Sequence, residues 1–303
     1  MLNLLCGPES RLPVLQAGGQ PGEWAAWSDP VCQGPAPAGL SQEAWRRVRA
    51  SFVARTWLLP FGEAHRRLVM EDELVARLDE WDELVIWAGP DPWAQTALIH
   101  LLARIGELES VSTPLSLADE TGQRRPITAE LISFAAHAWT AFTAPAPAAL
   151  AELAASDHPE LPALSSALRR LLLEYPGTDD GLSLTERWVL EELAAESGTT
   201  RELSRRVRAR EQYPWLDDMM FDAILLQLMG GSRPLISAGR WPTITEFPSA
   251  TLVLTAAGQA VLSRRADQVR LNGVDRWIGG VHLAGLDAFW RWNRAAGKLV
   301  SGR

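Results

Sequence analysis

The sequence predicts an α/β domain over residues 1–120, a helical connector over 121–181 and a winged-helix-like domain over 182–303. Three observations support this organisation. Short, almost wholly apolar runs alternate with amphipathic helical patterns in the first part, which is typical of a small parallel sheet covered by helices. Two polar segments, DETGQRRP (119–126) and PGTDDG (176–181), interrupt the chain. Three helical patterns and two strand patterns then follow in the order of a winged helix-turn-helix.

Four runs in the α/β domain have the length and composition of strands: LNLLC (2–6), EWAAW (23–27), ELVIWA (83–88) and SVSTPLSL (110–117). Between the second and third, Ser41 can cap a helix that runs to about Trp57, and spaced apolar residues over 68–81 mark another helix. The clearest helix follows the third strand. Asp91 is its expected N-cap and Pro92 its first residue, and apolar residues recur to position 105.

The connector contains two helical patterns, over 131–142 and 161–175, which flank the break TAPAPAA (143–149). No charged residue occurs from 131 to 151. Because this stretch is rich in alanine and interrupted by prolines, it predicts a buried helix and a linker, and no membrane span.

The last part begins with two capping boxes, Ser183 with Glu186 and Thr199 with Glu202, which predict the starts of two helices. A third helix is expected over 216–229, ending at a Gly-Gly pair. The runs PLISA (234–238) and ATLVL (250–254) can form a hairpin, after which Thr255 caps a helix to about residue 266.

Composition predicts a cytoplasmic globular protein. Of 303 residues, 47% are hydrophobic, and the start MLNLLCGPES reads as a first strand because it lacks the basic segment of a signal peptide. Cys6 and Cys32 form no CxxC pair, which suits a reducing compartment. The net charge of −8 argues against nucleic-acid binding by bulk attraction, but it is uneven: residues 1–181 carry −11 and residues 182–303 carry +3.

The whole chain resembles an uncharacterised bacterial family known as a domain of unknown function. The matching segments are Gly7–Ser10, Ser28–Val31 with Gly34-Pro35, Leu84–Trp87, Gly181–Ser183 with Glu186, and Trp277–Gly280. The resemblance implies no established activity. Where the family pattern has Gly-Asp-Ser after the first strand, this chain has Gly7-Pro8-Glu9-Ser10, so a carboxylate expected there is shifted or absent.

Small and polar residues follow the first three strands, where open α/β sheets bind ligands. The candidates for binding a small polar ligand are Gly7, Glu9 and Ser10, then Ser28, Asp29 and Gly34, then Gly89, Asp91 and Gln95. Asp91 is also a helix cap and Asp29-Pro30 a turn, so a purely structural role is the competing interpretation. Neither a Gly-x-Gly-x-x-Gly nor a Walker loop is present, and no particular cofactor is indicated.

The sequence contains no metal-binding motif and no evident catalytic set. Its histidines, His65, His100, His137, His158 and His282, occur in no HExxH or HxH pattern. A hydrolase that uses Asp29, Asp91 or Glu9 remains one alternative function, favoured if these carboxylates lie close together.

A DNA-binding regulator is the other alternative. The helix over 216–229 would enter the major groove, but its charged residues are Asp217, Asp218 and Asp222, which would oppose phosphates. Arginines do gather nearby, at positions 201, 205, 206, 208 and 210. We therefore expect protein contacts, and no specific DNA binding, from this domain.

The segment RWIGGVHL (276–283) alternates with the period of a strand and could pair with AFWRWN (288–293). Its two glycines either let bulky indoles approach closely or line a ligand pocket in which His282 would act. Packing is the favoured interpretation, and it predicts that Gly280→Val destabilises the fold. Together these patterns favour a cytoplasmic binding or regulatory protein.

Overall fold

The computed structural model describes residues 1–119 and 121–301, which form two compact units. The first unit comprises residues 1–169 together with Gly279–Val281, and the second comprises Arg170–Ile278 and the chain from His282 onward. Residues 121–169 of the predicted connector thus belong to the first unit, and residues 170–181 to the second. Position 120, the predicted end of the first domain, lies outside the described residues.

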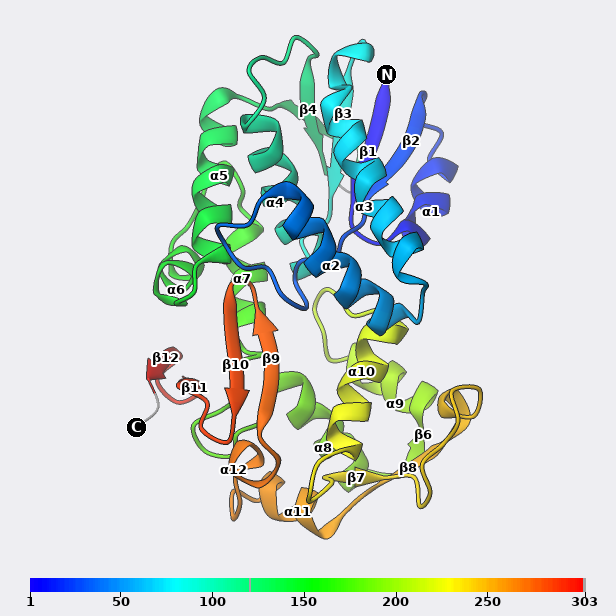
Figure 1. Ribbon diagram of the computed structural model, residues 1–303, viewed down its shortest axis with the longest axis vertical. Coiled ribbons are helices and arrows are strands. Elements are labelled where there is room, and N and C mark those ends of the chain that lie inside the picture. Colours follow the sequence, from blue (N-terminus) through cyan, green and yellow to red (C-terminus); the bar gives the residue numbers. More distant parts are fainter. Residues whose placement is uncertain (120, 302–303) are drawn as a thin grey trace. The chain divides into compact units, whose positions relative to one another are not determined.

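The first unit contains a sheet with strand order β2-β1-β3-β4-β5 (Figure 1). Strands β1 (Leu2–Cys6), β2 (Glu23–Trp27), β3 (Leu84–Ala88) and β4 (Leu115–Ala118) are parallel, and β5 (Arg124–Pro126) joins the edge antiparallel. Every residue of β1 is buried, as expected for a central parallel strand covered on both faces. The predicted mixed α/β class is confirmed.

The fourth strand begins five residues later than predicted because the preceding residues have other partners. The backbone amides of Ser112 and Thr113 donate to the Asp79 carboxylate at 2.8 and 3.2 Å, so they are not available for pairing with β3. Strand pairing starts only after Pro114, at Leu115.

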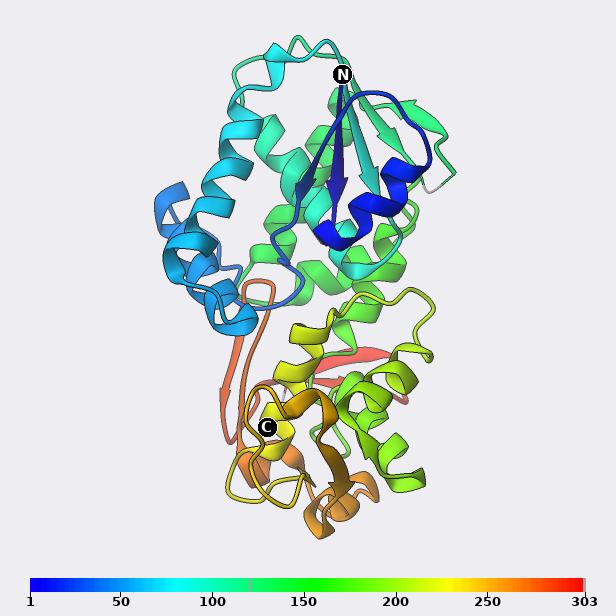
Figure 2. The same cartoon turned by 90° about the vertical axis from the view of Figure 1, so that its right-hand side faces the viewer.

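Helices cover both faces of this sheet (Figure 2). Helix α1 (Leu12–Ala17) lies on one face and α4 (Pro92–Gly106) on the other, and α5 (Ala129–Thr143) packs on α4. Burial of α4 is nearly complete because the sheet and α5 enclose it. The remaining helices of the unit are η1 (Glu9–Arg11), α2 (Gln42–Trp57), α3 (Phe61–Ala76), η2 (Leu78–Glu80) and α6 (Ala148–Ala155), while α7 (Leu164–Leu172) runs across the boundary into the second unit.

Side-chain caps fix the helix starts that the sequence predicts. Ser41 accepts from the amide of Ala44 at α2, and Asp91 accepts from Ala94 at α4. Both predicted capping boxes are present in the second unit, where they begin α8 (Leu184–Ala195) and α9 (Thr200–Arg208). Their hydrogen bonds satisfy amides that a helix leaves unpaired in its first turn.

The second unit is mixed, with short antiparallel strands. Helices α10 (Asp218–Met229), η3 (Phe247–Ser249), α11 (Ala256–Leu262) and α12 (Gln268–Asn272) accompany a three-stranded sheet of order β6-β8-β7. The predicted hairpin is confirmed as β7 (Ile236–Ser237) with β8 (Thr251–Leu254), and β6 (Gly198–Thr199) adds a strand that the sequence does not predict. No described helix is both long enough and apolar enough to cross a membrane.

The predicted pairing of RWIGGVHL with AFWRWN is wrong. Strand β9 (Val274–Ile278) pairs with β10 (Val281–Gly285), and β11 (Trp290–Asn293) pairs with β12 (Lys298–Ser301). Gly279 has a φ of 58°, a left-handed conformation that favours glycine, so the Gly-Gly pair turns the chain instead of continuing one strand.

Candidate functional site

The strand order places a topological switch point between β1 and β3. The chain leaves β1 toward β2 on one side and leaves β3 toward β4 on the other, so the loops after β1 and β3 diverge there. In doubly wound sheets such a crevice at the carboxyl ends of the strands is the usual ligand site. We call Gly7, Arg11, Gly89, Asp91 and Gln95 the switch-point residues.

Gly7 leaves open space directly after β1. Its φ of 134° is a backbone conformation that favours glycine, and its amide donates to the Trp27 carbonyl at 3.1 Å. A Cβ atom built at this position would have no heavy atom within 4 Å. Gly7 itself is buried, so this space lies beside the loop and is not exposed surface.

An ion pair between Arg11 and Asp91 joins the loop after β1 to the loop after β3. Asp91 accepts from the amide of Ala94 at 2.9 Å and from the Arg11 guanidinium at 3.0 Å. Burial raises the pKa of Asp91, and the Ala94 amide and Arg11 oppose that rise. Asp91 therefore caps α4, as its structural interpretation expects, and it also connects the loops at the switch point.

Two buried polar atoms on the first turns of α4 have no hydrogen-bond partner among the described residues. Gln95 is 4% exposed; its Nε2 donates to the Gly89 carbonyl at 2.7 Å, while its Oε1 is unpaired. The Nε1 of Trp93 is buried and unpaired as well. Because an unpaired buried polar group is costly, both atoms are candidates for contact with a ligand.

Asp29, at the end of β2, is held by a fully buried arginine. Its carboxylate receives hydrogen bonds from Arg49 Nε at 3.0 Å and from a terminal nitrogen at 2.7 Å. Arg49 also donates to the carbonyls of Pro30, Gln33 and Pro35 at 2.9 to 3.0 Å. This network fixes the loop after β2, so the observed role of Asp29 is structural.

Gly34, in the same loop, is a site of close packing. Its φ is 77°, and any Cβ atom would overlap the ring of Phe52. Ser28 is half-buried, and both its amide and its hydroxyl donate to Glu71 Oε1, at 2.7 and 3.1 Å.

Glu71 is the residue that sequence reasoning missed. It is buried on α3, and burial raises its pKa to about 8, assisted by repulsion from Asp29. A signal was available in the sequence: Glu71 falls at helical spacing between Leu68 and Val75, on the face that α3 buries. A carboxylate within an apolar stripe indicates a specific polar partner.

The other predicted site residues make few contacts. Glu9 and Ser10 are exposed on the short helix η1. His282 belongs to the second unit, where its Nε2 lies 2.7 Å from Asp275 Oδ1 and its ring stacks on Trp277 with centroids 4.4 Å apart. It is 41% exposed, so these contacts describe a surface pair on a hairpin.

The glycines before His282 contact main chain, not indole rings. A Cβ atom at Gly279 would overlap the Phe142 carbonyl oxygen, and one at Gly280 would overlap that of Thr143. Gly280 donates to Phe142 O at 2.9 Å, and Ala36 donates to Gly279 O at 3.0 Å. These contacts favour the packing interpretation, with backbone as the group that approaches.

Among the described residues no group of three or more His, Cys, Asp or Glu side chains could hold a metal ion. No family model matches the chain, and no curated protein is significantly similar to it. The assignment of function therefore depends on the geometry of the site.

Proposed function

We propose that the protein is a cytoplasmic bacterial binding or regulatory protein whose first unit binds a small polar molecule at the switch point. The observation that carries this proposal is Gln95 Oε1, a buried and unpaired acceptor on the first turn of α4, the helix that follows β3. Membership of the uncharacterised family that the sequence resembles is part of the same proposal.

The unpaired atom Gln95 Oε1 indicates the chemistry of the ligand. It requires a donor, such as a hydroxyl or amino group. The Arg11 guanidinium lies in the loop after β1 and contacts Asp91 in the loop after β3. Its charge favours a ligand with a carbonyl or acidic oxygen. A hydroxylated or aminated molecule with such an oxygen fits these groups, and a purely apolar ligand does not.

A thermal-shift panel tests this proposal with ribose, glucose 6-phosphate, glycine and Mg²⁺ as probes. A probe at a hundred times its Kd raises the unfolding free energy by about 2.7 kcal/mol. We expect at least one organic probe to raise the melting temperature, and Gln95→Leu to abolish that rise. Gln42→Leu, an exposed glutamine in the same unit, is the control and should keep it. If no probe acts on the wild type, or Gln95→Leu responds normally, the proposal fails.

For the second unit we infer a winged-helix arrangement that contacts protein. The order α8, β6, α9, α10, β7, β8 with sheet order β6-β8-β7 supports this arrangement. Trp241 and Ile244, in the connection between β7 and β8, are 60% and 63% exposed, and exposed apolar residues of this size favour a protein partner.

The helix that would read DNA in such an arrangement is acidic. Burial and repulsion from Asp218 and Asp217 raise the pKa of Asp222 on α10 to about 6. The nearby arginines are largely neutralised: Arg206 pairs with Glu196, Arg208 with Asp218 and Arg210 with Glu191. Both features oppose the DNA-regulator alternative.

A hydrolase is the second candidate, favoured by one observation. Ser28 Oγ lies 3.1 Å from Glu71 Oε1, and because burial raises the pKa of Glu71 to about 8, this carboxyl group could accept the hydroxyl proton only above about pH 8. Asp29 does not support the hydrolase alternative, because its carboxylate is already hydrogen-bonded to Arg49. Assays with nitrophenyl acetate and nitrophenyl phosphate test the candidate: turnover that Ser28→Ala and Glu71→Gln both abolish would support it, and equal rates in all three proteins would exclude it.

A further inference from the structure

A cleft of 840 Å³ lies within the second unit, remote in sequence from the switch-point residues. Its walls are the turn between α11 and α12, the connection from β10 to β11, the end of β12 and the loop at Thr178 and Asp179. Four of its lining residues are arginines, at positions 264, 265, 270 and 291. Its volume is within the range of sites for small molecules.

The carboxylates of the cleft balance only part of this charge. Asp267 is occupied by Arg291, with contacts of 2.5 and 3.2 Å, and Asp179 lies 3.5 Å from Arg264. Arg265 and Arg270 are exposed and have no ion-pair partner among the described residues. The third carboxylate, Asp287, is likewise exposed on the rim.

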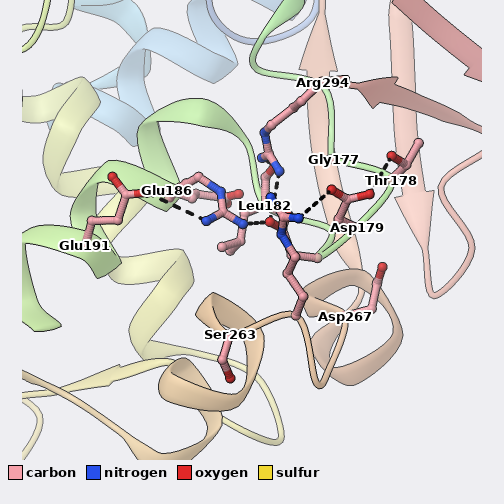
Figure 3. Close-up of polar contacts among 12 residues, drawn as sticks. Gly177, Thr178, Asp179, Leu182, Glu186, Glu191, Ser263, Asp267 and Arg294 are labelled. Atoms are coloured by element: carbon pink, nitrogen blue, oxygen red, sulfur yellow. Dashed lines mark hydrogen bonds and ion pairs between the residues drawn. The ribbon is translucent and has the colours of Figure 1, made fainter. Parts of the chain in front are cut away.

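A second group of arginines adjoins Asp180, which follows Asp179 in sequence. Arg187 and Arg294 both contact the buried carboxylate of Asp180, and Arg187 also lies 3.6 Å from Glu191. Figure 3 draws Arg294, Asp179 and Asp267 in one close-up. Burial lowers the pKa of Arg294; Asp179, Glu191 and Glu186 raise it, and Arg264 lowers it. The lining of the cleft itself has four arginines against three carboxylates, a formal excess of one positive charge.

One further feature is typical of a binding site. The φ of 60° at Arg264 is not such a feature, because Arg264 is the left-handed residue that ends helix α11. Phe289 lines the cleft, is 60% exposed, and meets Trp290 edge-on with ring centroids 5.0 Å apart. Its ring offers a surface on which a flat group can stack.

We propose that this cleft binds a phosphorylated small molecule with a flat ring, of the mononucleotide class. Arg265 and Arg270 contact the phosphate, because the planar guanidinium fork matches phosphate oxygens. Phe289 contacts the ring. This ligand neutralises the excess charge and covers the exposed phenyl group with one molecule, which neither inorganic phosphate nor an apolar ligand can do.

Titration calorimetry of the full chain with ADP tests the site. We expect saturable binding that weakens at least about tenfold in Arg265→Ala/Arg270→Ala, since charge-assisted bonds are roughly twice as strong as neutral ones. Arg201→Ala/Arg205→Ala is the control, because it removes two exposed arginines of the same unit outside the cleft, and it should bind normally. Equal losses in the two double variants would overturn the proposal, as would the absence of binding to the wild type.

A second comparison isolates the ring contact. Phe289→Ala should weaken ADP several-fold and leave the affinity for inorganic pyrophosphate unchanged. Equal affinities of the wild type for ADP and pyrophosphate, or tighter binding of a single-stranded oligonucleotide than of ADP, would refute a mononucleotide-class site. Gln95→Leu should bind ADP normally here, so the outcome is independent of the switch-point proposal.

Discussion

Single residues at the carboxyl ends of the strands are of two kinds: those whose polar atoms all have hydrogen-bond partners, and those with an unpaired polar atom. Asp29 is a reasonable ligand candidate from its position, yet Arg49 encloses it with bonds to both oxygens. An arginine 20 residues away cannot be assigned to it from sequence, because only the fold brings helix α2 to that loop. Gln95 has the opposite character, since half of its amide group remains unpaired.

Glu71 gives a prediction for the pH dependence of stability. Its folded pKa of about 8 exceeds the ordinary value of 4.5, so the folded state holds the proton more tightly than the unfolded state. The stabilisation is complete below the unfolded pKa and is lost as pH rises through the folded pKa. A tenfold difference in proton affinity between the two states corresponds to about 1.4 kcal/mol, so a loss of a few kcal/mol is expected at most.

The window from about pH 6.5 to 8 isolates this effect, because model-peptide carboxyl groups have titrated below it. Asp222, with its pKa of about 6, has largely completed its titration below it as well. Burial lowers the pKa of folded His100 to about 3, but unfolded histidine titrates near 6.5; this contribution is common to the wild type and Glu71→Gln and cancels in their comparison. Urea unfolding should show the wild type losing stability across this window, whereas Glu71→Gln should change far less. A wild-type profile parallel to that of Glu71→Gln would show that Glu71 is not protonated in the folded protein.

At the scale of elements, the sequence predicts structure wherever the signal is local. Ser183 with Glu186 and Thr199 with Glu202 lie within one helical turn of each other, and both boxes form as the spacing requires. The three apolar runs that form β1, β2 and β3 are equally clear. By contrast β6 has only two residues, so its pairing with β8 depends on tertiary contact and leaves no periodic pattern.

The β9–β10 hairpin shows where periodicity fails. RWIGGVHL alternates through both glycines, but the period of a strand does not reveal whether the chain continues or reverses. The glycines are needed because Phe142 and Thr143 present carbonyl oxygens to them, and those residues lie far earlier in the chain. The sequence indicates close approach and does not identify the partner.

Gly280→Ala tests this contact with a single added methyl group. We expect a loss of about 1 to 3 kcal/mol in unfolding free energy, because the Cβ atom would overlap the Thr143 carbonyl oxygen and the backbone must shift. Gly62→Ala is the matched control: it lies in helix α3 with no atom within 4 Å of the new Cβ, and alanine favours helix. Urea midpoints of both variants decide the matter; equal midpoints would refute close packing at the turn.

At the scale of the whole molecule, the strand order limits where a ligand can be expected. Among the described residues of the sheet, the junction of β1 and β3 combines diverging loops with the unpaired Gln95 Oε1. After β2, Ser28 bonds to Glu71 on α3 and Asp29 to Arg49 on α2, although Trp27 Nε1 and Gln33 Oε1 are unpaired there as well. Composition could not reveal these bonds, since Ser28 and Asp29 are the same residue types that bind ligands elsewhere.

Charge distribution gives the last prediction, which concerns DNA. Although residues 182–303 carry +3, the arginines of α9 and its following turn are mostly paired with acids, and α10 exposes Asp218. Nucleic-acid affinity depends on unpaired cations that displace counterions from phosphates. We therefore expect no operator-specific complex, and only salt-sensitive association with a Kd of about 10⁻⁴ to 10⁻⁶ M at physiological salt. Mobility shifts against genomic fragments measure this directly. Arg201→Ala/Arg205→Ala should reduce the residual binding, because these two arginines are exposed and unpaired among the described residues. A nanomolar, sequence-selective complex would instead establish the regulator alternative.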